Sequence, residues 1–145
     1  MLNIELFNLS VAEVLGVCYE SFPERIHIRS ITISDKVSGY YPEESNDDEN
    51  NIVWQIFPIA TATIQWLEQA GYIWVGNQEQ DDFLGVTLTP KGLELLNMIP
   101  DSLSQKEPVG SLLLGGLKTS AKETALTIMK TVLAEGLKMS LKGGS

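Results

Sequence analysis

The segment TIQWLEQAGYIWVGNQEQDD, residues 63–82, contains the signals that decide the fold of this chain. Its apolar residues recur at helical spacing and predict a helix that ends at Gly71, where glycine is favoured as a left-handed C-cap. The alternating residues YIWV then predict a β-strand, and GNQEQDD predicts the turn of a hairpin. The same 20 residues contain four acidic residues and no lysine or arginine, so the segment carries only negative charge.

The residues on either side extend this pattern. An apolar stripe predicts that the helix begins near Asn51, with a kink or a break at Pro58. After the turn, FLGVTLT predicts a second strand, and Thr89 followed by Pro90 predicts the N-cap and first turn of another helix. The expected core residues are Ile56, Ile64, Leu67, Ile73, Val86, Leu88, Leu93 and Leu96.

The N-terminal part of the chain gives weaker signals. Ser10 begins the capping-box sequence SVAE, which predicts a helix from Ser10 to a point before Pro23. RIHIRSITI, residues 25–33, is compatible with a strand or with a short helix. Residues 34–51, SDKVSGYYPEESNDDENN, are polar and contain glycine and proline, so we expect a loop with an acidic flank.

The C-terminal part is predicted to be a linker, residues 101–119, followed by an amphipathic tail helix, residues 120–140, that begins with a second capping box at Ser120. A helix with such a wide apolar face must bury it somewhere. It can pair with a second copy of the chain, fold back on its own domain or lie on a membrane. Self-association is the expectation, through Ala125, Ile128, Val132 and Leu133.

Composition sets broad limits. A chain of 145 residues is long enough for one stable domain. The basic n-region of a signal peptide is missing, and no apolar run approaches the roughly 18 residues of a membrane span. One cysteine rules out an internal disulfide framework. We therefore expect a cytoplasmic protein without a membrane span.

Catalytic and ligand-binding motifs are not evident in the sequence. Cys18 and His27 are the only cysteine and histidine, and Cys18 lies on the apolar face of its helix, where a buried, inert thiol is expected. One cysteine and one histidine cannot make a zinc site, and the acids of residues 43–49 lack the spacing of a calcium loop. We expect a protein that is not an enzyme and has no metal, cofactor or small-molecule ligand.

The order of helix, glycine exit, strand, turn, strand and helix resembles the winged-helix superfamily, especially bacterial regulators of the MarR and PadR kind. Leu67 to Gly71, with Tyr72 and Ile73, match the exit of the recognition helix, and Leu88-Thr89-Pro90-Lys91-Gly92 match the entry into the next helix. The match covers residues 52–97. It implies an α+β, mostly helical fold: a winged helix-turn-helix over residues 1–100 with a two- or three-stranded wing sheet, followed by the C-terminal amphipathic helix.

The charge departs from that family's pattern. Net charge is −9 overall and −12 over residues 1–108, and no basic residue lies between Lys36 and Lys91. DNA binding by a winged helix rests on lysine and arginine contacts to phosphates. The candidate interaction face is instead neutral or acidic: Gln65, Glu68, Gln69, Trp74, Glu79, Asp81 and Asp82.

Three functions therefore remain. The first is a non-enzymatic winged-helix module that acts in protein–protein interaction or regulation. The second is a dimeric, DNA-binding transcriptional regulator that uses Arg25, Arg29, Lys36 and the tail lysines. The third is an inhibitor whose acidic face imitates DNA and occupies a DNA-binding protein. The charge distribution favours the first, with a protein or a second copy of the chain as the partner and with DNA disfavoured.

A salt titration tests this choice. Because the candidate face lacks cations, we expect no measurable affinity for random duplex DNA at about 100 mM salt. Fluorescence anisotropy with a labelled duplex provides the measurement. Sub-micromolar binding that is lost when Gln65 and Gln69 are changed to alanine would favour the regulator instead.

Overall fold

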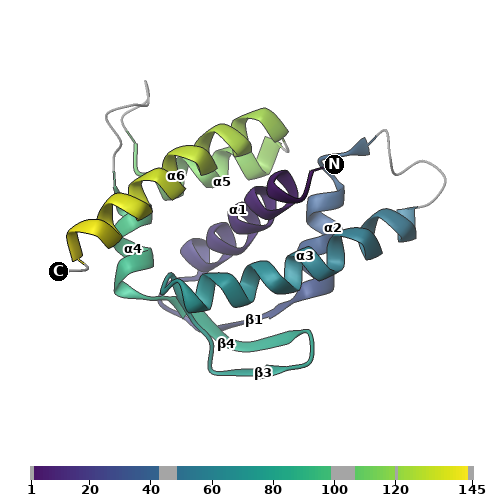
Figure 1. The fold of residues 1–145 in the computed structure, drawn as a ribbon, viewed down its shortest axis with the longest axis horizontal. Coiled ribbons are helices and arrows are strands. Elements are labelled where there is room, and N and C mark those ends of the chain that lie inside the picture. Colours follow the sequence, from purple (N-terminus) through teal and green to yellow (C-terminus); the bar gives the residue numbers. More distant parts are fainter. Residues whose placement is uncertain (1, 43–48, 99–106, 120, 144–145) are drawn as a thin grey trace.

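A computed structural model describes residues 2–42, 49–98, 107–119 and 121–143 and confirms an α+β, mostly helical chain (Figure 1). Over these residues it has six helices and a small antiparallel sheet of four strands. Helix α1 (Asn3–Ser21) lies in the middle. Helix α3 (Glu49–Gln69) packs on one side of it, and α5 (Val109–Thr119) and α6 (Lys122–Gly143) pack on the other.

Helix α1 begins at Asn3, so the prediction that Ser10 caps the first helix is wrong. Both Ser10 and Glu13 of the supposed capping box are buried inside the helix. The turns before Ser10 are helical because Leu6 and Leu9 are buried in the core, and tertiary packing outweighs a local capping preference. As a result, α1 is buried over most of its circumference, as expected for a helix with other helices on several sides.

The segment 25–33, for which the sequence allowed a strand or a short helix, contains a strand followed by the start of a helix. Strand β1 (Ile26–Arg29) is followed directly by helix α2 (Ser30–Ser38), which packs against α3. The loop prediction is therefore wrong for residues 34–38, where Val37 completes the buried face of α2. The acidic residues 43–48 lie outside the described part of the chain.

Helix α3 follows its prediction closely. It runs unbroken through Pro58, so of the two expected alternatives, a kink or a break, the break does not occur. Pro58 is exposed, on a side where water can solvate the carbonyl that loses its hydrogen bond. Gly71 has φ of +86°, which confirms the left-handed exit. Of the predicted core residues, Leu93 is partly buried and the others are fully buried: Ile56, Ile64, Leu67, Ile73, Val86, Leu88 and Leu96.

The predicted hairpin between Tyr72 and Leu88 is confirmed. Its strands are β2 (Ile73–Trp74), β3 (Asn77–Glu79) and β4 (Asp82–Leu88). Strand β4 is central and pairs with β1, β2 and β3. The turn is tighter than predicted, because residues 77–79 are a strand and the turn itself is Gln80 and Asp81.

A bulge in β4 keeps two apolar side chains in the core. Ile26 pairs with Val86 and Ile28 with Phe83, so two steps along β1 match three along β4. The extra residue restores inward alternation, and both Phe83 and Val86 are fully buried. Gly85 sits in the bulge with φ of +66°, a conformation that favours glycine.

Helix α4 (Pro90–Asn97) begins as predicted, since the Thr89 hydroxyl accepts a hydrogen bond from the Gly92 amide at 3.0 Å. Part of the stretch expected to be a linker is helix α5, which the sequence analysis missed. The tail helix α6 packs against α1, α4 and α5, while Ser120 lies outside the described residues.

The face proposed for self-association is covered by the chain itself. Ala125, Ile128 and Val132 are buried, and Leu133 is partly buried against the same core. In the structure the tail helix therefore folds back on its own domain, with Ala125, Ile128 and Val132 facing the core.

The bulge predicts the cost of a side chain at Gly85. An added Cβ meets nothing nearer than 3.5 Å, so the cost of Gly85→Ala is that of the backbone conformation, about 1–2 kcal/mol of unfolding free energy. Urea denaturation provides the measurement. Gly115→Ala is the matched control, because this glycine lies in α5 with open space around it and alanine favours helix there. Equal effects of the two substitutions would contradict the role of the bulge.

Candidate functional site

The predicted interaction face begins on the last two turns of α3. Glu68 and Gln69 are exposed there. Gln65 is half-buried, and its side-chain amide donates a hydrogen bond to the Gln78 side chain of β3 at 3.3 Å. This contact ties α3 to the hairpin, and Glu68 and Gln69 are the exposed members of the predicted set on α3.

A relay of hydroxyl groups fixes the tip of the hairpin. The Thr61 hydroxyl of α3 donates to the Ser30 hydroxyl at 2.7 Å, and the Ser30 hydroxyl donates to the backbone carbonyl of Asp81 at 3.0 Å. The Ser30 backbone amide donates to the same carbonyl at 3.0 Å. These bonds connect α3, the start of α2 and the hairpin, and Ser30, which is fully buried, lies at their centre.

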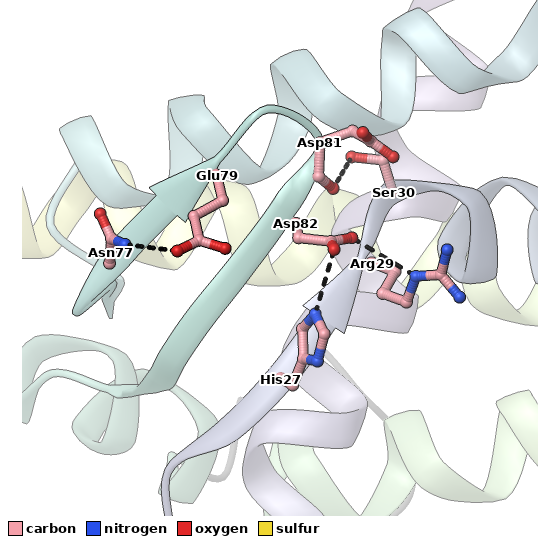
Figure 2. Close-up of polar contacts among 7 residues, drawn as sticks. All are labelled: His27, Arg29, Ser30, Asn77, Glu79, Asp81 and Asp82. Atoms are coloured by element: carbon pink, nitrogen blue, oxygen red, sulfur yellow. Dashed lines mark hydrogen bonds and ion pairs between the residues drawn. The ribbon is translucent and has the colours of Figure 1, made fainter.

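The acids of the hairpin have neighbours that the sequence analysis did not place beside them. Figure 2 shows Asp82 between two side chains of β1: its carboxylate lies 3.4 Å from the Arg29 Nε and 3.7 Å from the His27 Nε2. On the other strand, Glu79 accepts a hydrogen bond from the Asn77 side chain at 3.4 Å. Antiparallel pairing of β1 with β4 places Arg29 beside Asp82, so the hairpin region is less negative than the sequence of the hairpin alone indicates.

Trp74, the predicted aromatic member of the face, lies on β2 and is 49% exposed, as predicted. The Arg25 guanidinium lies 5.8 Å from the centre of its ring, within range of a cation–π contact. Arg25 also donates a hydrogen bond to the Gly85 carbonyl at 2.8 Å. The residues of the predicted interaction face therefore come from two elements, the end of α3 and the hairpin.

A different apolar surface lies between the N-terminal turns of α1 and the middle of α3. It is a shallow groove of about 440 Å³ whose lining is almost entirely apolar. Ile4 is 63% exposed and Trp66 is 41% exposed, which are high values for such large apolar side chains. The residues that line the groove are Asn3, Ile4, Phe7, Ile59, Ala62, Thr63 and Trp66.

Aromatic packing holds the Trp66 ring in place at the edge of the groove. Phe7 meets it edge-on, with ring centres 5.1 Å apart, and Tyr72 lies against it with ring centres 6.0 Å apart. Such pairs stabilise a defined ring orientation. A helix that begins at Ser10 leaves the groove out of the sequence prediction, although Ile4 and Phe7 continue the helical spacing upstream of Val11.

The lining of the groove carries no charged side chain. Neither α1 nor α3 contains lysine or arginine. Glu5 of α1 accepts a hydrogen bond from the Tyr41 hydroxyl, which lowers the pKa of Glu5, and Lys122 of α6 lies 3.3 Å from its carboxylate. At the other end of α3, Glu68 is exposed. The groove is therefore apolar and uncharged, and the charged residues of the two helices that form it are all acids, of which Glu5 is paired with Lys122.

The single cysteine and histidine lie in different environments. Cys18 is buried in the core, and burial raises the pKa of its thiol to about 12, as expected for an inert thiol. His27 is half-exposed on β1 beside Asp82. Among the described residues, no three histidine, cysteine or acidic side chains are grouped so that they can hold a metal ion.

No protein-family model, curated protein or solved structure matches this chain. Along the described ranges, no helix has the length and apolar character to cross a membrane. The groove and the hairpin must therefore be interpreted from their own chemistry.

The hydroxyl relay predicts that Ser30→Ala lowers the unfolding free energy by about 1–2 kcal/mol, because the substitution removes a buried hydrogen-bond donor from the Asp81 carbonyl. Thr61 can still donate to the Phe57 carbonyl, which limits the loss. Thr32→Ala is the control, since Thr32 is exposed on the same helix and should change stability by less than about 0.5 kcal/mol. A loss at Ser30 no larger than at Thr32 would mean that the relay does not stabilise the hairpin.

Proposed function

We propose that this chain is a winged-helix module that binds a protein partner through the groove between α1 and α3. The order of elements supports the winged-helix part of the proposal. Helices α2 and α3 are adjacent in the chain and pack against each other, the β3–β4 hairpin follows in the place of a wing, and β1 adds a third strand. This order of elements supports the proposal together with the resemblance carried by the residues around Gly71 and Thr89.

The exposed, apolar groove carries the proposal for a protein partner. Large apolar side chains that gather on a surface mark interaction sites more often than isolated ones do. Tryptophan is enriched among the residues that contribute most to protein–protein binding, and Trp66 is already fixed by Phe7 and Tyr72. A fixed ring loses little conformational entropy on binding, which favours affinity.

Charge defines the chemistry of the partner. Because the groove is apolar and the helices beside it carry only acids, its complement is a segment with apolar anchors flanked by lysine or arginine. An amphipathic helix provides both features along one face, at the spacing that a groove between two helices accepts. We propose a basic amphipathic helix as the occupant.

The same features argue against DNA as the ligand. Helix α3, which would enter the major groove, has no cation, and its exposed face includes Trp54, Pro58 and Ala62. Arg29 of β1 already contacts Asp82, and Arg25, which precedes β1, contacts the Gly85 carbonyl. Phosphate contacts would have to come from elsewhere on the chain.

Binding of a labelled helical peptide made of leucine and lysine tests the proposal, with fluorescence anisotropy as the measurement. We expect micromolar affinity, and at least a tenfold loss, about 1.4 kcal/mol, for Ile4→Glu or Trp66→Ser. Trp54→Ser is the matched control, because Trp54 is exposed on the same helix but does not line the groove. The same peptide with glutamate in place of lysine should not bind.

Two results would overturn the proposal. One is equal weakening by the Trp66 and Trp54 substitutions, which would mean that the peptide binds the acidic surface without using the groove. The other is tighter binding of duplex DNA than of the peptide at the same salt concentration.

A further inference from the structure

A second cleft lies among α1, α2 and α5, apart from the residues that line the groove. Its volume is about 390 Å³, in the range of small-molecule sites. Three helices form its walls, and its lining mixes apolar and charged side chains: Glu13, Gly16, Val17, Glu20, Asp35, Lys36, Gly39, Tyr40, Leu114 and Leu117.

Glu13 is the unusual residue of this cleft. It lies in the middle of α1 and is only 8% exposed, whereas glutamate is almost never this buried unless it is paired. The Tyr40 hydroxyl donates a hydrogen bond to its carboxylate at 2.8 Å, and no described cation lies within ion-pair distance of it. Burial raises the pKa of Glu13 despite that hydrogen bond.

The remaining charges in the cleft are mostly negative. Glu20 from α1 and Asp35 from α2 add two carboxylates, and Lys36 from α2 is the one ammonium group in the described lining. The described part of α5 contributes only apolar side chains, Leu114 and Leu117. A carboxylate excess beside an apolar wall favours a ligand that has a cationic head and an apolar body.

We propose that this cleft binds a small organic amine, with its ammonium group on the Glu13 carboxylate and its apolar body between Val17, Leu114 and Leu117. The ammonium would supply the partner that a buried carboxylate needs, and Tyr40 would hold the carboxylate in position. The apolar body would cover side chains that now line an open cleft. The cleft shares no lining residue with the groove, so a test of amine binding does not depend on the proposed protein partner.

Anionic ligands fit the same cleft poorly. A carboxylate ligand would meet Glu20 and Asp35 at close range, with Lys36 as the one described cation to balance them. Neutral ligands of the same shape would leave the Glu13 carboxylate without a cation. These two classes therefore serve as comparison probes.

Isothermal titration calorimetry with 2-phenylethylamine, 2-phenylethanol and 3-phenylpropionate on the full chain tests the proposal. We expect the amine to bind at least tenfold more tightly than either comparison probe, and Glu13→Gln to remove that preference. Glu24→Gln is the matched control, because Glu24 is exposed and does not line the cleft. If Glu13→Gln does not fold, Glu20→Gln should still weaken amine binding.

Two further readouts separate binding from a structural role of Glu13. Lys36→Gln should tighten amine binding by about two- to tenfold, because it removes a like charge from the cleft wall. Affinity should also rise with pH through the raised pKa of Glu13, since the amine stays charged up to about pH 9, as lysine does, while the carboxyl group loses its proton. Equal affinity for the amine and 3-phenylpropionate, or unchanged amine binding in Glu13→Gln, would overturn the proposal.

Discussion

Burial of α1 on nearly all sides is the constraint on which the rest of the structure depends. Its sequence places apolar residues around most of the helix, so one neighbouring helix cannot cover it. Helix α3 covers one side and α5 and α6 cover the other, and α2 closes part of the remaining circumference. Both candidate sites lie where this cover is incomplete: the groove at the first turns of α1, and the cleft beside Glu13.

Much of the fold could be predicted from local signals because those signals are short and physical. A glycine after an apolar stripe predicts a left-handed exit, and Gly71 has that conformation here. Thr89 with Pro90 predicts a helix start, and Thr89 is the N-cap of α4. What could not be predicted depends on distant packing. Helix α5 looks like a linker because of its glycines, but Gly110 allows the helix to approach the Tyr19 ring of α1 closely. The start of α1 and the docking of α6 depend on the same core.

The candidate sites show the same division. The exposure of Trp74 and the inert environment of Cys18 follow from their positions along single elements, and the structure agrees with both. The groove and the cleft each combine residues that are far apart in the sequence, such as Ile4 with Trp66 and Glu13 with Tyr40. Charge counting along the chain also missed the contact of Arg29 with Asp82, because strand pairing, and not sequence distance, creates it.

The way in which the hairpin tip is held has a consequence for sequence variation. Ser30 bonds the backbone carbonyl of Asp81 and makes no use of its carboxylate, and every residue type has that carbonyl. These bonds therefore place no demand on the side chain of Asp81, and the charge at this position can change without loss of either bond. Substitutions at this position can change the surface charge of the hairpin while the backbone bonds to Ser30 remain. The hairpin can therefore acquire a preference for a different partner without a change in the core.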